Sequence, residues 1–243
     1  MHDPLWRSTF EDVYAAPAFQ RRWYIVGGNH DDYQNVSAQI EYTKHSSRWF
    51  FPHFYYSETL FREEDASHTV SHQSRTLKSD ESSSPSWASN VLASDGDNAQ
   101  SPSPTPPARQ LHPLIDMIFL DSQMLVGPGG DTAQYKWFAD AVDASEADFL
   151  LVVSHYPIFS GGSHGNTPAL LEYIKPIMDT YKASAFLSGH DHILQHLRDS
   201  SSDVHYIGAG TGCKSSSRAT ILPQTLFVRY WMGRLCARVC NPA

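Results

Sequence analysis

The sequence predicts an α/β domain in which a largely buried sheet lies between layers of helices. The main observation is that short apolar runs alternate with segments of helical periodicity along the chain, which is typical of a sheet covered by helices. The second observation is length, because a chain of 243 residues can bury one sizeable hydrophobic core.

The first part of the chain is predicted to contain two helices and a strand. Asp3 can cap a helix that has Pro4 at its first position, and aromatic residues follow at helical spacing. The apolar run at residues 23–26 predicts a strand that ends at a glycine pair, and residues 35–46 have the periodicity of a second helix.

The second part carries the remaining predicted strands and helices. The apolar runs that predict strands span residues 114–120, 149–153, 185–187 and 204–207. A helix is predicted over residues 132–144, and another begins at Asn166. Pro176 is expected to kink or split this last helix, because proline has no amide hydrogen and clashes with the preceding turn.

The composition divides one domain into two parts. Residues 65–110 consist mainly of Ser, Pro, Asp, Glu and Asn, and such a segment buries too little apolar surface to offset the entropy of ordering it. We expect a disordered insertion there, with residues 1–64 and 111–212 as the two parts of the domain. A phosphoregulated or partner-docking loop is the alternative for the insertion. Residues 213–243 form a divergent tail that is basic.

Charge and hydropathy exclude several classes of protein. The 26 acidic and 18 basic residues give a net charge of −8, which argues against binding nucleic acid through a basic surface. No apolar run reaches the roughly 20 residues of a transmembrane helix. The N-terminal residues lack the basic and apolar regions of a signal peptide, so we expect none in this chain.

Three motifs with chemistry-bearing residues each follow a predicted strand. They are G-G-N-H-D at residues 27–31, S-H-Y-P at residues 154–157 and S-G-H-D-H at residues 188–192, and His164 comes nine residues after His155. Parallel strands end at one edge of a sheet, so we expect these side chains to converge. Imidazole nitrogens and amide oxygens bind zinc and first-row transition metals, and the motifs therefore predict a metal site.

Two details of the motifs refine this prediction. His190 and His192 are two residues apart, so they project the same way from an extended segment, and a small turn would let each serve a different ion. Asn29 offers a neutral oxygen, which would complete a coordination shell without adding negative charge.

The three motifs resemble the last three of the five sequence blocks of the calcineurin-like metallophosphoesterases. The sequence is more similar still to the small, mammalian-type purple (tartrate-resistant) acid phosphatases. The flanking segments that share this similarity are residues 3–7, 35–40, 48–49, 51–52 and 205–210. The resemblance covers roughly residues 1–61 and 111–212, and it implies a layered α/β/β/α sandwich.

This resemblance implies a dinuclear centre of Fe(III) with a second Fe, Zn or Mn. By resemblance, Asn29, His155 and His190 would hold the second metal, and His192 would bind the iron. His30 and His164 would be catalytic residues that face the phosphate and the leaving group. The implied reaction is hydrolysis of phosphate monoesters by in-line attack of a metal-held hydroxide, with a protonated histidine as acid, so we expect a metal-dependent acid phosphatase.

The resemblance also gives expectations about the cellular setting. It favours a secreted or lysosomal protein, in which the sequon Asn35-Val36-Ser37 would be a glycosylation candidate. We further expect a monomer whose partner is the phosphate monoester, with no nucleic-acid partner and no transmembrane segment.

The chain departs from the family pattern in one respect. The family's first two blocks, D-x-G and G-D-x-x-Y, supply an iron-binding Asp, the bridging Asp and an iron-binding Tyr, and this chain has neither block. We therefore expect a version of the fold that is incomplete at the N-terminus and also at the C-terminus. Because those metal-binding residues are missing, we expect this chain alone to be weakly active or inactive. An inactive fragment or pseudoenzyme of the family and a phosphodiesterase on the same scaffold stay open as alternatives.

Overall fold

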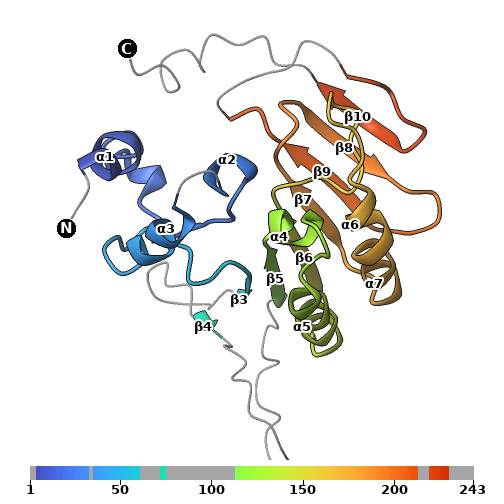
Figure 1. Ribbon diagram of the computed structural model, residues 1–243, viewed down its shortest axis with the longest axis horizontal. Helices are drawn as coiled ribbons and strands as arrows, with labels where there is room; N and C mark the ends of the chain where they lie inside the picture. Colours follow the sequence, from blue (N-terminus) through green and yellow to red (C-terminus); the bar gives the residue numbers. More distant parts are fainter. Residues whose placement is uncertain (1–3, 33–34, 61–71, 75–112, 213–218, 230–243) are drawn as a thin grey trace, which may run out of the picture.

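Four parallel strands form the centre of the main sheet (Figure 1). The computed structural model describes residues 4–32, 35–60, 72–74, 113–212 and 219–229. Within these residues the sheet has the order β10-β8-β9-β7-β6-β5-β3-β4, with β5, β6, β7 and β9 parallel and the other strands antiparallel to their neighbours. The strands are Tyr56–Leu60 (β3), His72–Ser74 (β4), Ile115–Leu120 (β5), Phe149–Ser154 (β6), Ala185–Ser188 (β7), Leu194–Arg198 (β8), His205–Ala209 (β9) and Thr225–Arg229 (β10). The predicted strands of the second part correspond to the four parallel strands.

A second, smaller sheet forms near the N-terminus. It pairs β1 (Trp23–Tyr24) with β2 (Trp49–Phe50) in parallel. The predicted strand at residues 23–26 is therefore shorter than expected and belongs to a different sheet from the strands that follow it. An apolar run identifies a strand but does not identify its pairing partner.

The predicted helices occur in the predicted order, and two short helices that were not predicted, at residues 29–32 and 122–126, lie among them. The helices are Pro4–Trp6 (α1), Asn29–Asp32 (α2), Val36–Tyr42 (α3), Ser122–Val126 (α4), Thr132–Asp143 (α5), Pro168–Tyr173 (α6) and Lys175–Thr180 (α7), and a π-helical turn, Arg7–Glu11, continues α1. Asp3, the predicted cap of the first helix, lies outside the described residues. The split expected from Pro176 is confirmed, because α6 and α7 are separate helices.

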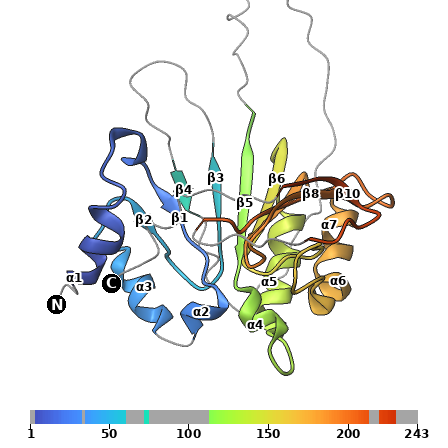
Figure 2. The ribbon, with the colours of Figure 1, turned by 90° about the horizontal axis from the view of Figure 1, so that it is seen from above.

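Hydrophobic residues pack on both faces of the large sheet. On β5, Ile118 and Leu120 face the core beneath the helices, which also includes Phe138 of α5. The alternate residues Met117 and Phe119 face a second core formed with the small sheet and α3, as the two-residue period of a strand requires. Helices α5–α7 thus cover one face, and the small sheet and α3 cover part of the other (Figure 2). The mixed α/β class is confirmed.

Two segments differ from the sequence prediction. His72–Ser74 lies within the predicted disordered insertion but forms β4 beside β3, and the remainder of residues 65–110 lies outside the described residues. Thr225–Arg229 lies within the predicted divergent tail but forms β10. Its run of Leu, Phe and Val favours a strand that extends the sheet.

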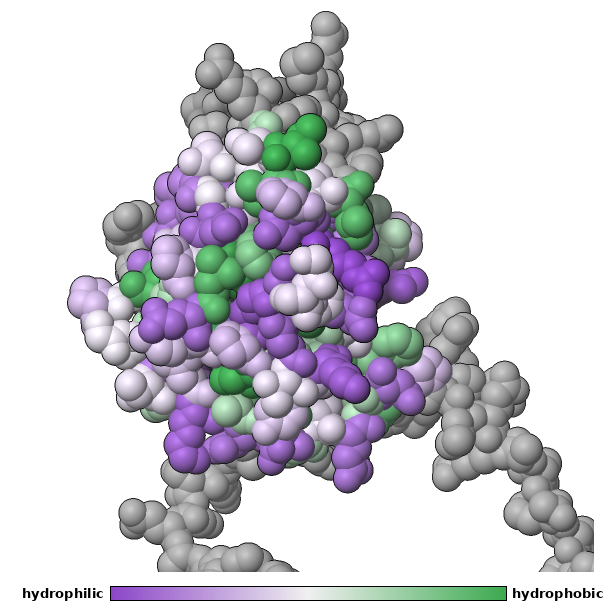
Figure 3. All heavy atoms as spheres, turned by 90° about the vertical axis from the view of Figure 1, so that its right-hand side faces the viewer, coloured by the Kyte–Doolittle hydropathy of each residue, from purple (hydrophilic) through white to green (hydrophobic). Residues whose placement is uncertain are grey.

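The surface that carries α6, α7 and β10 shows separate groups of hydrophobic residues among hydrophilic ones (Figure 3). Leu226 of β10 is one of the exposed apolar residues, at 58% exposure. No helix in the described part of the chain is long and apolar enough to cross a bilayer.

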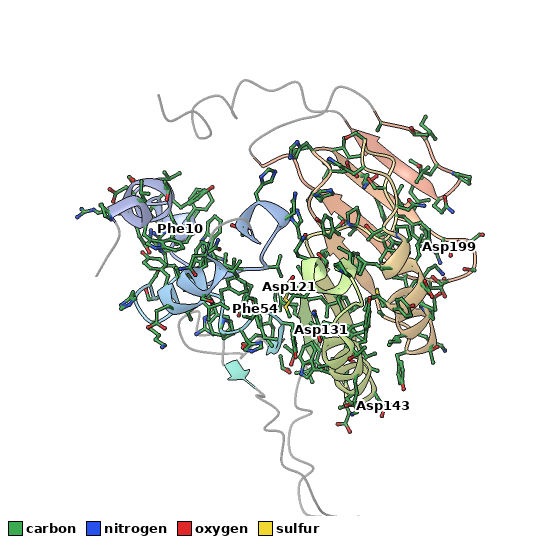
Figure 4. All side chains as sticks on the ribbon, viewed as in Figure 1. Phe10, Phe54, Asp121, Asp131, Asp143 and Asp199 are labelled. Carbon is green, nitrogen blue, oxygen red and sulfur yellow. The ribbon has the colours of Figure 1, made fainter. Side chains whose placement is uncertain are left out.

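A shielded ion-pair network joins α7 to the turn between β8 and β9. The Lys175 ammonium lies 2.6 Å from Asp179 and 2.8 Å from Asp199, which is in that turn (Figure 4). We expect Lys175→Met to lower the free energy of unfolding by about 1–3 kcal/mol, because two shielded carboxylates lose their cation. Urea denaturation would measure the change. Lys136→Met is the matched control, since its pair with Asp140 is exposed, and an equal loss in both variants would contradict the prediction.

Candidate metal centre

Asn29 is held at the end of a tight glycine turn. The Gly28 amide donates to Asp31 Oδ2 over 2.9 Å, and Gln39 Nε2 donates to Asp31 Oδ1 over 2.6 Å. Asp31 therefore closes the turn. A Cβ atom at Gly28 would lie only 2.8 Å from His155 Nδ1, so glycine lets this backbone approach the imidazole.

Three predicted ligand candidates meet at one point. His155, which directly follows β6, has its Nε2 atom 2.8 Å from Asn29 Oδ1 and 3.1 Å from His190 Nδ1. His190 follows β7, and β6 and β7 are adjacent and parallel. Asn29 follows β1 and so arrives from the small sheet. The three candidate ligands therefore come from two different sheets. The sequence prediction had placed all of them at one edge of a single sheet.

The segment that carries His190 and His192 is a compact turn, so the small turn considered for it above is present and an extended conformation is not. His190 has a φ of 59°, in the left-handed region that side chains rarely adopt. The Asp191 amide donates to the Gly189 carbonyl over 2.7 Å, and the Ile193 amide donates to the Asp191 carbonyl over the same distance. A strained backbone of this kind is found mainly at functional sites.

His164 and Tyr156 pack around the His190 ring. The ring centroids of His164 and His190 are 4.2 Å apart, and His164 Nδ1 lies 2.8 Å from Asp191 Oδ1. Tyr156 meets His190 edge to face at 4.5 Å and donates its hydroxyl to Gln123 Oε1 over 2.6 Å. The sequence analysis did not single out Tyr156 as a site residue, although it lies inside the S-H-Y-P motif.

The electrostatic environment favours neutral imidazoles at the centre. Burial, reinforced by the neighbouring charge of His190, lowers the pKa of His155 to about 4. Burial and the nearby His164 also lower the pKa of His190. The charges of His30 and His192 contribute to both shifts, which places these two residues in the same electrostatic neighbourhood. His155 therefore stays unprotonated in mildly acidic solution, and the lowered pKa of His190 favours its neutral form as well, as metal binding requires.

The donor atoms fit one metal ion. In an octahedral shell with metal–nitrogen distances of about 2.1 Å, neighbouring donors lie about 3.0 Å apart. The measured separations of 2.8 and 3.1 Å match this spacing. A complete second site is not present in the described residues, which contain no group of three His, Cys, Asp or Glu suited to a metal. The Asp31 carboxylate accepts a hydrogen bond within its own loop, and the Asp191 carboxylate accepts one from Ser160, in the loop that carries His164.

We expect Gly28→Ala to lower the affinity of this centre for Zn²⁺ by at least about 10-fold. The added methyl group would lie within 3 Å of the His155 ring and would displace it. Calorimetric titration of metal-free protein with Zn²⁺ would measure the change. Gly127→Ala is the matched control, because its Cβ would meet its nearest neighbours at an ordinary 3.5 Å. Equal affinities for the two variants would contradict the prediction.

Comparison with known proteins gives a consistent result. A sequence model of the calcineurin-like phosphoesterase family matches residues 5–194. Tartrate-resistant acid phosphatase type 5 of Mus musculus is 34% identical over 212 residues, which are 86% of this chain and 55% of that protein. Purple acid phosphatase 17 of Arabidopsis thaliana is 26% identical over 244 residues, covering 93% of this chain and 57% of that protein. The chain spans about half the length of these curated relatives.

A solved structure shares the fold. GAP50, described as the anchor in the inner membrane complex of Plasmodium, superposes with a TM-score of 0.65 at 20% sequence identity. The match covers 93% of this chain and 62% of the other.

Proposed function

The chain belongs to the calcineurin-like phosphoesterase family, and on that premise we propose that it is a metal-dependent acid phosphatase that hydrolyses phosphate monoesters. The observation that carries the proposal is the meeting of Asn29 Oδ1, His155 Nε2 and His190 Nδ1, from three separate segments, at the spacing of a coordination shell. Similarity to acid phosphatases over most of the chain supports the choice of monoesters as substrates.

Each residue of the site has a distinct role in this proposal. Membership of the family implies a dinuclear metal centre, and we propose Fe(III) with a second Fe, Zn or Mn. Asn29, His155 and His190 would hold the divalent ion, and His192 would contribute to the iron site. The ions would supply Lewis-acid polarisation of the phosphate ester and of the attacking water.

His30 and His164 would act on the substrate itself. Both are exposed at the surface of the site, where a protonated imidazole can donate a proton to the departing oxygen as the P–O bond breaks. A general acid must carry its proton when the bond breaks, and similarity to acid phosphatases supports an acidic working pH.

The test combines metal analysis with two substrates. The protein would be purified with Fe and Zn supplied, its metal content measured by mass spectrometry, and its rates compared on an aryl phosphate monoester and the matching diester at pH 5. The proposal predicts two bound ions per chain and faster release from the monoester, whereas the described residues by themselves complete only one site. A faster diester rate would favour a phosphodiesterase, and the absence of turnover on both esters would refute the enzymatic proposal.

A catalytically inactive member of the family is the second candidate. The observation that favours it is that the described residues offer three donors for one ion but no group of three His, Cys, Asp or Glu suited to a second. It predicts at most one weakly held ion per chain, so the same metal analysis separates the two candidates.

We also propose a secreted or lysosomal location. Asn35, in the sequon Asn35-Val36-Ser37, is exposed at the N-terminus of α3, where its Oδ1 atom accepts a hydrogen bond from the Ala38 amide over 3.1 Å. When the protein is directed into the secretory pathway of a eukaryotic cell, glycosidase treatment is expected to reduce its mass. Asn35→Gln should remove that change, and an unchanged glycosidase shift in this variant would exclude Asn35 as the modified residue.

A further inference from the structure

Asp191 connects the two loops that form the site. It lies between His190 and His192 in the chain, yet its side chain is only 1% exposed and turns away toward the loop of His164. Its Oδ1 atom accepts hydrogen bonds from both the His164 amide, over 3.2 Å, and His164 Nδ1, over 2.8 Å. One carboxylate oxygen thus fixes the backbone and the ring of the same histidine.

The other carboxylate oxygen is held by a buried network. Asp191 Oδ2 accepts from the Ser160 hydroxyl over 2.5 Å. That hydroxyl accepts in turn from the Gly162 amide, over 2.9 Å, and from Gln195 Nε2, over 3.0 Å. Because both lone pairs of the Ser160 oxygen are used, its hydrogen must point to Asp191. The direction of every hydrogen bond in the network is therefore set.

The packing leaves little freedom for this arrangement. A Cβ atom at Gly162 would lie 2.3 Å from Asp191 Cγ, and one at Gly210 would lie 2.1 Å from the Asp191 carbonyl oxygen. Side chains at either glycine would displace Asp191 from its position, so the carboxylate is fixed by shape as well as by hydrogen bonds.

These contacts determine which nitrogen of His164 faces outward. A carboxylate only accepts hydrogen bonds, so His164 Nδ1 must carry a proton whether the ring is neutral or charged. The side chain of His164 remains 54% exposed although its Nδ1 atom contacts the buried Asp191, and its ring lies 4.2 Å from the His190 ring.

We propose that Asp191 is a positioning residue that locks His164 in its Nδ1-protonated form and presents Nε2 to the leaving group of the substrate. The presentation of Nε2 to a substrate rests on the proposed function, whereas the locked form of the ring does not. Carboxylates that orient a histidine in this way fix both its tautomer and its direction.

The first test examines the ring itself in metal-free protein. Two-bond ¹H–¹⁵N NMR spectra, recorded at a pH at which the ring is neutral, should show His164 with a protonated Nδ1 and a bare Nε2. Asp191→Ala, and to a smaller extent Ser160→Ala, should shift the neutral His164 ring toward the Nε2-protonated form that predominates in water. Asp140→Ala is the control, because Asp140 is an exposed residue of α5. A protonated Nε2 in the unmodified protein would overturn the proposal.

The second test determines whether Asp191 acts on catalysis through His164 or only supports the structure of the site. With metal content matched, we expect Asp191→Ala to lower kcat by about 10- to 100-fold while KM changes less than about threefold. In a His164→Ala background the same substitution should cost less than about threefold, because the residue acts through His164. An equal loss in both backgrounds would overturn the positioning role. The NMR test requires no turnover, so failure of the proposed function and failure of this inference give different results.

Discussion

His190→Ala is expected to abolish phosphate release and to lower the affinity of the centre for its divalent ion by more than about 100-fold. Loss of a partner outside the coordination shell already lowers metal affinity by roughly 10- to 100-fold, and removal of a ligand should cost more. The imidazole supplies the Nδ1 atom that lies 3.1 Å from His155 Nε2. Without it, two donors remain at the meeting point of the three segments.

Metal content after dialysis and phosphate release from an aryl monoester would measure the two effects. His53→Ala is the matched control, because His53 is exposed and its Nδ1 atom contacts only the nearby Tyr55 carbonyl among the described hydrogen bonds. Far-UV circular dichroism would verify that both variants are folded. Unchanged turnover in His190→Ala would refute the assignment of the centre.

Part of this centre could be predicted from the sequence because β6 and β7 are adjacent and parallel. Ser154 and Ser188, the last residues of these strands, are register partners. Residues that follow such strands meet at one edge of the sheet, and His155 and His190 do so. The strands themselves are short apolar runs that a sequence pattern identifies well.

Two features of the site depend on contacts that no local sequence pattern encodes. They are the position of Asn29 beside His155 and the network that holds His164. Asn29 comes from the small sheet, and an apolar run does not specify its partner strand. Gln195 supports the Asp191 network from β8, a strand whose alternation of Leu, Gln and His lacks a continuous apolar face. A buried polar side chain in a strand is visible only when its distant hydrogen-bond partners are known.

The same limitation applies to the anchor of the N-terminal segment. The Arg48 side chain is 8% exposed and forms an ion pair with Glu11, to which Nε donates over 3.1 Å. Its guanidinium also donates to the Glu11 carbonyl, over 3.0 Å, and to the Tyr14 carbonyl, over 2.5 Å. Glu11 Oε1 accepts from Tyr42, over 3.0 Å, and from Ser46, over 2.6 Å. One ion pair thus joins the first helical segment to α3 and β2.

Arg48→Met is expected to lower the free energy of unfolding by about 3 kcal/mol, the low end of the range for breaking a buried pair by removing one partner, because the Glu11 side chain is 28% exposed. Methionine fills a volume similar to that of arginine, so the substitution leaves no large cavity. The lost stability would therefore come from the unpaired Glu11 carboxylate and from two carbonyl groups that lose their hydrogen-bond donor. Urea denaturation at pH 7 would measure it. Arg7→Met is the control, because the pair between Arg7 and Asp12 is exposed and its loss should cost less than about 1 kcal/mol.

The effect of Arg48→Met should depend on pH in a defined direction. Although burial opposes it, hydrogen bonds from Ser46 and Arg48 lower the pKa of Glu11 below its ordinary value of 4.5. A carboxyl group with a depressed pKa in the folded state stabilises the protein above its unfolded pKa, and this stabilisation disappears as the pH falls through the folded pKa. The difference in stability between the native protein and Arg48→Met should therefore be complete at pH 6 and should shrink below pH 4.5. A difference that did not shrink as the Glu11 carboxylate became protonated, followed by NMR of its side chain, would show that the ion pair with Glu11 does not account for the effect.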